Sequence, residues 1–137
     1  MMRDKIKVLA AAAALAVGAV VATAMPASAA PSPPSGGSWD HTWTTSDSAH
    51  GGTVYIQEHG DVVELCDTAA DGYAPRVTVY NTDGYELTAS DGYGTCVVAS
   101  ASQGGSHDLP EGKEIYVDIW LGPANGWETE HSYLNDH

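Results

Sequence analysis

Basic residues are scarce in this 137-residue chain, which has five lysines and arginines against 18 aspartates and glutamates. Three of the five, Arg3, Lys5 and Lys7, lie at the beginning, so that the rest of the chain keeps only Arg76 and Lys113. An acidic surface repels nucleic-acid phosphates and anionic lipid head groups, because the attraction that drives those associations is reversed. The composition therefore excludes nucleic acid as a partner. It favours solubility in an extracellular medium, and a cationic partner is the less favoured explanation.

The only long apolar run follows the three early basic residues, over 8–25, and is rich in alanine. Ala27-Ser28-Ala29 then supplies the small-residue pattern of a signal-peptidase site. We interpret residues 1–29 as a cleaved signal peptide rather than a membrane anchor, since alanine is weakly hydrophobic. Two basic and 17 acidic residues would remain, a net charge of −15. We therefore predict a secreted, extracellular protein with no membrane association after cleavage.

Two regions are expected after cleavage. Residues 30–38, "APSPPSGGS", are proline, serine and glycine without apolar periodicity, which predicts a flexible leader. Residues 39–137 are enough for one domain, and we expect it to be monomeric.

Cysteine is also scarce, with Cys66 and Cys96 as the only two. In an exported chain they predict one disulfide, and a closed loop of about thirty residues stabilises by about 3.5 kcal/mol on the chain-entropy model. A metal or redox role favours closer spacing, such as C-x-x-C, and further ligands. The structural role is the better interpretation.

A sustained helical repeat is absent after residue 29. Short runs rich in Val, Ile, Thr, Tyr and Trp are instead broken by glycine and aspartate, which predicts strands. Strands are expected at 39–45, 52–58, 61–66, 75–81, 85–90, 95–101 and 113–121, with a weaker one at 127–133. This spacing predicts an antiparallel β-sandwich of seven or eight strands with immunoglobulin-like proportions.

Alternation along the strands predicts which side chains face the core. Val77 and Val79 share one face of their strand, and Ile115, Val117 and Ile119 share one face of another. The segment 61–66 is ambiguous, because Cys66 is in phase with Val62 rather than with the apolar Val63 and Leu65. A bulge or a strand end near the cysteine would explain it.

Three stretches of the sequence resemble a known group of proteins. They are "GDVVELCDTAADGYAPRVTVY", "GTCVVASASQGG" and "LPEGKEIYVDIWL", at 60–80, 94–105 and 109–121. Together they resemble small exported proteins of high-GC Gram-positive bacteria, a group without an established activity. The resemblance implies export, a β-rich fold and one disulfide, but no chemistry.

The tripeptide Asp-Gly-Tyr occurs three times, at 71–73, 83–85 and 91–93. A calcium loop is one interpretation, with Asn81, Asp83 and Glu86 or Asp67 and Asp71 as ligands, but neither segment has EF-hand spacing. Turn chemistry fits better, since Asp-Gly is favoured where both turn residues need positive φ. We therefore expect turns between strands and no cofactor.

Metal and catalytic patterns are equally sparse. The six histidines show neither H-E-x-x-H nor an i, i+2 pair, which predicts no metal site, although 130–137 could bind copper or zinc loosely. Ser106, His107 and Asp108 are contiguous and cannot form the hydrogen bonds of a catalytic triad. No G-x-S-x-G motif is present. We therefore predict that the protein is not an enzyme.

Outward-facing aromatic residues are the best candidates for binding. If the apolar faces point inward, then Tyr80, Tyr116 and Trp120 lie on an outer face, and Tyr55 is a further candidate. An aromatic surface suits sugar rings or a protein partner. The alternative is that segments around Trp39, Trp43 and Trp127 cover these residues in a second small core.

The sequence therefore predicts a secreted binding or accessory module whose partner is an extracellular protein or a polysaccharide. One alternative is carbohydrate or cell-wall binding through Tyr80, Tyr116 and Trp120. Another is an inhibitor of an extracellular hydrolase that presents the loop 102–112.

Overall fold

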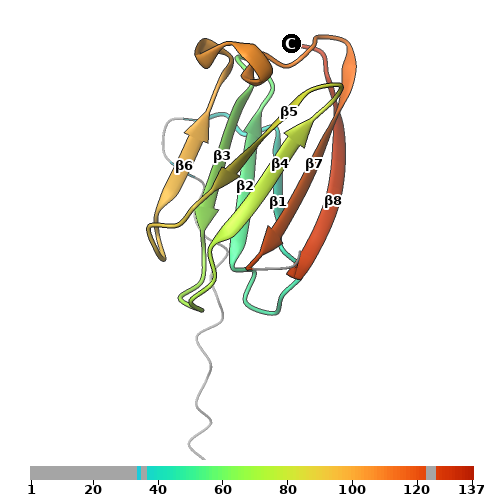
Figure 1. Cartoon of the computed structure of the whole chain (residues 1–137). Coiled ribbons are helices and arrows are strands. Elements are labelled where there is room, and N and C mark those ends of the chain that lie inside the picture. The colour runs from blue at the N-terminus through green and yellow to red at the C-terminus, as the bar shows by residue number, and fades with distance from the viewer. Residues whose placement is uncertain (1–33, 35–36, 123–125) are drawn as a thin grey trace, which may run out of the picture.

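A computed structural model describes residues 34, 37–122 and 126–137, and this part of the chain forms two antiparallel four-stranded sheets that stack on each other (Figure 1). The β-sandwich predicted from the sequence is confirmed. The predicted signal peptide and most of the predicted leader lie outside the described residues, so that both remain predictions.

Each sheet draws its strands from separate parts of the sequence. Sheet A has the order β1-β2-β3-β6 and sheet B the order β5-β4-β7-β8. Two short 3-10 helices, η1 and η2, follow β6. The elements are β1 His41–Thr44, β2 Gly52–Gln57, β3 Val62–Asp67, β4 Pro75–Tyr80, β5 Gly84–Thr88, β6 Cys96–Ala99, η1 Ala101–Gln103, η2 Gly105–His107, β7 Lys113–Leu121 and β8 Gly126–Asn135.

The core lies between the sheets and follows the predicted alternation. Val77 and Val79 of β4 are fully buried, as are Ile115, Val117 and Ile119 of β7. Sheet A contributes aliphatic side chains at alternate positions of β2 and β3 in the same way. Further members of the core are Val54, Ile56, Val63, Leu65, Ala89, Leu109 and Tyr133.

The strand predicted to be weak is well formed. β8 has ten residues and pairs with β7 from Lys113↔Asn135 to Leu121↔Gly126. Its weak signal has a physical reason, because the β8 residues paired with buried Ile119, Val117 and Ile115 are Thr129, His131 and Tyr133 rather than aliphatic ones. An edge strand with polar and aromatic inward residues gives little hydrophobic alternation.

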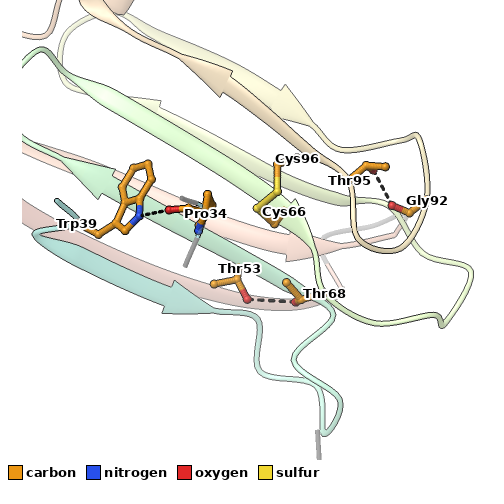
Figure 2. Close-up of a disulfide and its surroundings, with 8 residues drawn as sticks. All are labelled: Pro34, Trp39, Thr53, Cys66, Thr68, Gly92, Thr95 and Cys96. Carbon is orange, nitrogen blue, oxygen red and sulfur yellow. Dashed lines mark hydrogen bonds between the residues drawn. A yellow bond between two sulfur atoms is a disulfide. The ribbon is translucent and has the colours of Figure 1, made fainter. Parts of the chain in front are cut away.

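The disulfide joins neighbouring strands of one sheet, at the register pair Cys66↔Cys96 of β3 and β6, where the Cα atoms are 4.0 Å apart (Figure 2). The pairing is regular from Val63↔Ala99 to this point, so the ambiguity of 61–66 needs no bulge. Cys66 lies on the outer face of sheet A, while the preceding Leu65 enters the core. The bond therefore holds edge strand β6 to β3 and does not join the two sheets.

The outer face of sheet A is covered in part by the segment before β1. Tyr55 of β2 is only 1% exposed although it alternates with the core residues Val54 and Ile56. The Trp39 ring lies 5.6 Å from the Tyr55 ring, and the indole Nε1 of Trp39 donates a hydrogen bond to the Pro34 carbonyl at 3.2 Å (Figure 2). Trp39 therefore covers Tyr55 on sheet A, as the alternative of a second small core proposed. Tyr80 and Tyr116 belong to sheet B.

Edge strands β1 and β8 close one side of the sandwich. The Trp43 ring of β1 stacks on the His131 ring of β8, with centroids 4.6 Å apart and planes 4° apart. The Thr129 hydroxyl donates to the Thr44 carbonyl at 3.0 Å. Burial lowers the pKa of His131, although the charge of Asp118 acts in the opposite direction.

Removal of the disulfide should weaken the fold. We expect the Cys66→Ala, Cys96→Ala double variant to lose about 3.5 kcal/mol of unfolding free energy, because the unfolded chain regains the entropy of an open loop of 30 residues. Urea unfolding followed by tryptophan fluorescence measures the loss. An unchanged midpoint and slope would show that β6 is held by its other contacts.

Stability should depend on His131 in mildly acidic solution. Because the pKa of folded His131 lies below the ordinary 6.5, the unfolded chain binds a proton that the folded chain does not. The unfolding free energy therefore decreases as the pH falls from 6.5 toward the pKa of His131 in the folded protein. His131→Phe should remove much of this decrease, because phenylalanine does not titrate. The substitution breaks no hydrogen bond of Nε2, which has no partner among the described residues.

The measurement is urea unfolding at about pH 7.5 and about pH 5.5. His59→Gln changes an exposed histidine and is the matched control. The difference between variants isolates His131 from Asp61, Glu64 and Asp67, whose pKa values are raised by burial and act in the opposite direction. Equal pH dependence in wild type and His131→Phe would contradict the assignment.

Candidate functional site

The outer face of sheet B carries the tyrosine pair that the sequence pointed to. Tyr80 of β4 and Tyr116 of β7 are direct register partners, and their rings stack with centroids 5.4 Å apart and planes 25° apart. Tyr116 is 41% exposed. Because the rings face each other, they form one stacked pair and not a flat two-ring platform. On the side away from Tyr80, the register partner of Tyr116 is Ser132 of β8.

Trp120 does not extend this aromatic surface. It lies on β7 opposite Arg76 of β4, but only 8% of its surface is exposed. The pairing of β7 with β8 is irregular between Ile119 and Leu121, which places Trp120 at the irregular position. Simple alternation cannot reveal that irregularity. The expected patch of three exposed aromatic residues is therefore reduced to Tyr80 and Tyr116.

A hollow of about 260 Å³ lies beside the tyrosine pair, where β4, β7 and β8 adjoin. On its β8 side, the Ser132 hydroxyl donates to Glu114 Oε1 at 2.7 Å, and the Tyr116 hydroxyl donates to Glu114 Oε2 at 3.4 Å. These bonds hold the Glu114 carboxylate beside the pair. The residues that line the hollow are Tyr80, Tyr116, Asp118, Glu130, His131 and Ser132.

Carboxylates give this face a negative potential. Oxygen atoms of Asp118, Glu128 and Glu130 lie within 4.8 Å of one another. Burial raises the pKa of the Tyr80 hydroxyl, and so do the charge of Asp118 and a hydrogen bond with it. Arg76 brings a positive charge to the same sheet, but its Nε lies 3.6 Å from Glu86 Oε1, and this ion pair offsets the charge. The face therefore suits neutral or cationic ligands and disfavours anionic ones.

The sequence located only part of this site. Tyr116 and Asp118 are two residues apart on β7, so that their common face follows from alternation alone. Glu130 and Ser132 were missed, because their position depends on the register Asp118↔Glu130 and Tyr116↔Ser132 between β7 and β8. No motif in the sequence gives that register.

The segment 102–112, which the inhibitor alternative would present to a hydrolase, is tied to its own domain. The backbone N–H of Leu109 donates to Asp61 Oδ2 at 2.8 Å, and the Asn135 side chain donates to Asp61 Oδ1 at 3.0 Å. Burial raises the pKa of Asp61 in spite of these hydrogen bonds, which act to lower it. A second hollow, of about 370 Å³, lies between residues 81–83, residues 105–110 and Lys113.

Of the contiguous Ser106, His107 and Asp108, the histidine packs against the sandwich. The His107 ring lies 4.4 Å from the Tyr85 ring, and its Nδ1 is 3.2 Å from the Gly104 carbonyl oxygen. These contacts close the β5 side of the sandwich above the core.

The three Asp-Gly-Tyr copies differ in conformation. Gly72 and Gly92 have φ of 78° and 100°, whereas Gly84 is part of β5 and pairs with Tyr80. Among the described residues the aspartates of these copies do not have positive φ, so the expectation of turns with both residues at positive φ is wrong in detail. The Asp71 carboxylate accepts a hydrogen bond from the Tyr73 backbone at 2.9 Å, which is a turn contact.

No protein-family model matches the chain, and no curated protein or solved structure shows significant similarity to it. The resemblance to small exported proteins therefore stays a prediction. Within the described residues, no helix combines the length and apolar character needed to cross a membrane.

Trp120 and Tyr116 should respond differently to truncation. Trp120→Ala removes a buried ring, and we expect a loss of about 3 kcal/mol in unfolding free energy. Tyr116→Ala removes a ring that is 41% exposed, and a loss below about 1 kcal/mol is expected. Urea unfolding of both variants compares them. A loss as large for Tyr116→Ala would mean that the tyrosine pair supports the fold.

Proposed function

We propose that this protein is a secreted, non-catalytic binding module and that the hollow beside Tyr116 binds a sugar ring of an extracellular polysaccharide. The observation that supports this most directly is the combination of one available tyrosine face with carboxylates and a hydroxyl at the same hollow. The disulfide agrees with an oxidising, extracellular compartment.

The arrangement matches the two requirements of sugar recognition. A sugar ring has an apolar C–H face, which packs on the flat face of an aromatic side chain. Its hydroxyls need hydrogen-bond partners, and Asp118 and Glu130 supply acceptors. The Ser132 hydroxyl, which donates its proton to Glu114, supplies a further acceptor.

The charge of the site narrows the class of sugar. Asp118, Glu128 and Glu130 would repel uronic acids, sulfated sugars and teichoic acids. Neutral sugars and amino sugars remain, and the latter gain attraction from the carboxylates. We therefore expect binding to a neutral or amino-sugar polymer.

The inhibitor alternative has less support. Leu109 and the adjacent segment are bonded to Asp61 and Asn135 of the same chain. A loop that inhibits a hydrolase has to enter the active site of its partner, and these bonds hold the loop to its own sandwich. The hypothesis stays a prediction without a specific contact in its favour.

A binding assay tests the proposal. Wild-type protein is incubated with insoluble chitin, chitosan, cellulose and β-glucan, and bound protein is measured by depletion. We expect saturable binding to at least one polymer and at least a tenfold loss of affinity in Tyr116→Ala, since the stacking surface is removed. One factor of ten corresponds to about 1.4 kcal/mol.

Tyr93→Ala is the matched control, because Tyr93 is 66% exposed and does not line the hollow. It should bind like the wild type. An equal loss in both variants would show nonspecific aromatic adsorption. If the folded wild-type protein binds none of these polymers, the sugar proposal is overturned.

A further inference from the structure

Four chemically suitable side chains meet at one end of the sandwich, and none of them lines the hollow beside the tyrosine pair. His41 is the first residue of β1, Glu58 directly follows β2, and Asp136 and His137 directly follow β8. Figure 1 shows the C-terminal end of the chain at the end of the sandwich where β8 finishes. Imidazole nitrogens and carboxylate oxygens are both ligands of Zn²⁺.

Glu58 is the centre of the group. Only 8% of this glutamate is exposed, and its two carboxylate oxygens face different histidines. Oε1 is 2.6 Å from His41 Nε2, and Oε2 is 3.9 Å from His137 Nε2. Both ion-pair partners that the structure gives this buried carboxylate are therefore histidines.

The spacing around His137 fits one metal ion. His137 Nε2 lies 3.2 Å from Asp136 Oδ1 and 3.9 Å from Glu58 Oε2. Ligand atoms of Glu58, Asp136 and His137 all lie within 4.8 Å of one another. Two ligand atoms on a tetrahedral Zn²⁺ with bonds of about 2.0–2.1 Å are separated by about 3.4 Å. The two distances at His137 bracket that separation.

We propose that Glu58, Asp136 and His137 bind one Zn²⁺ ion, with His41 as the residue that positions Glu58. His41 donates to Glu58 Oε1 and leaves Oε2 for the ion. The ring of His41 is itself fixed between two aromatic rings. Its centroid lies 5.2 Å from that of Trp43, on which it stacks, and 4.9 Å from that of Tyr133. A hydrogen bond to a ligating carboxylate orients it in this way in metal sites.

The backbone of Glu58 is also held in place. Its N–H donates to Asp40 Oδ2 at 2.8 Å, so that both the main chain and the carboxylate are oriented before an ion arrives. A mixed nitrogen and oxygen set favours Zn²⁺ over Ca²⁺, which prefers six to eight oxygen ligands. This inference does not depend on sugar binding, since the residues and the face are different.

Calorimetric titration of the untagged protein with ZnCl₂ tests the site. We expect one equivalent of Zn²⁺ per chain, together with a rise in the midpoint of thermal unfolding. His137→Ala should weaken binding at least tenfold, and its side chain is 64% exposed, so the fold should be unaffected. Glu58→Gln should do the same, and His41→Phe should weaken binding about tenfold through loss of orientation.

His59→Ala is the matched control, because His59 is an exposed histidine next to Glu58 and is not part of the cluster. It should bind Zn²⁺ like the wild type. An equal loss in His59→Ala and His137→Ala would show loose binding by surface histidines and overturn the proposal. So would several weak equivalents, no binding by the wild type, or Ca²⁺ binding of equal strength. Failure here would leave the sugar assay untouched.

Discussion

Burial of one face of each sheet is the constraint on which the other features of this protein depend. Side chains of a strand alternate between the two faces, so every apolar residue placed in the core directs its neighbours outward. Val77 and Val79 are fully buried, and Tyr80 is consequently on the outside of sheet B. In the same way Leu65 enters the core and Cys66 lies on the outside of sheet A. The tyrosine pair and the disulfide are both consequences of this alternation.

The two sides of the sandwich need a different solution, because edge strands have a neighbour on only one side. At the β1–β8 side the flat rings of Trp43 and His131 fill the space between the sheets. At the β5–β6 side His107 packs on Tyr85. At β6 the disulfide adds a covalent link to the hydrogen bonds with β3. Histidine serves here as a flat aromatic residue, which explains two of the six histidines without a ligand.

Polar groups collect where strands end, since backbone and side chains there are not covered by a second sheet. Asp61 binds the Leu109 backbone and the Asn135 side chain, and this links the β2–β3 turn, the segment before β7 and the end of β8. Glu58 belongs to the same β2–β3 turn, three residues before Asp61, and contacts His41 and His137. The outer face of sheet B offers an aromatic surface with acids, whereas the strand ends offer a mixed histidine and carboxylate set. The two proposed sites therefore differ in chemistry as well as in position.

The sequence by itself determined the fold class, the strands and the inward residues, because alternation, turn chemistry and the pairing of two cysteines are local or have one solution. It also placed Tyr80 and Tyr116 on an outer face. Only the tertiary structure decided that Trp120 is buried, that Glu130 and Ser132 adjoin Tyr116, and that His41, Glu58 and His137 meet. Those facts depend on strand register, on an irregular pairing beside Trp120, and on which strand ends share one end of the sandwich. Contacts between distant segments leave no periodic signal in the sequence, and both proposed sites are built from such contacts.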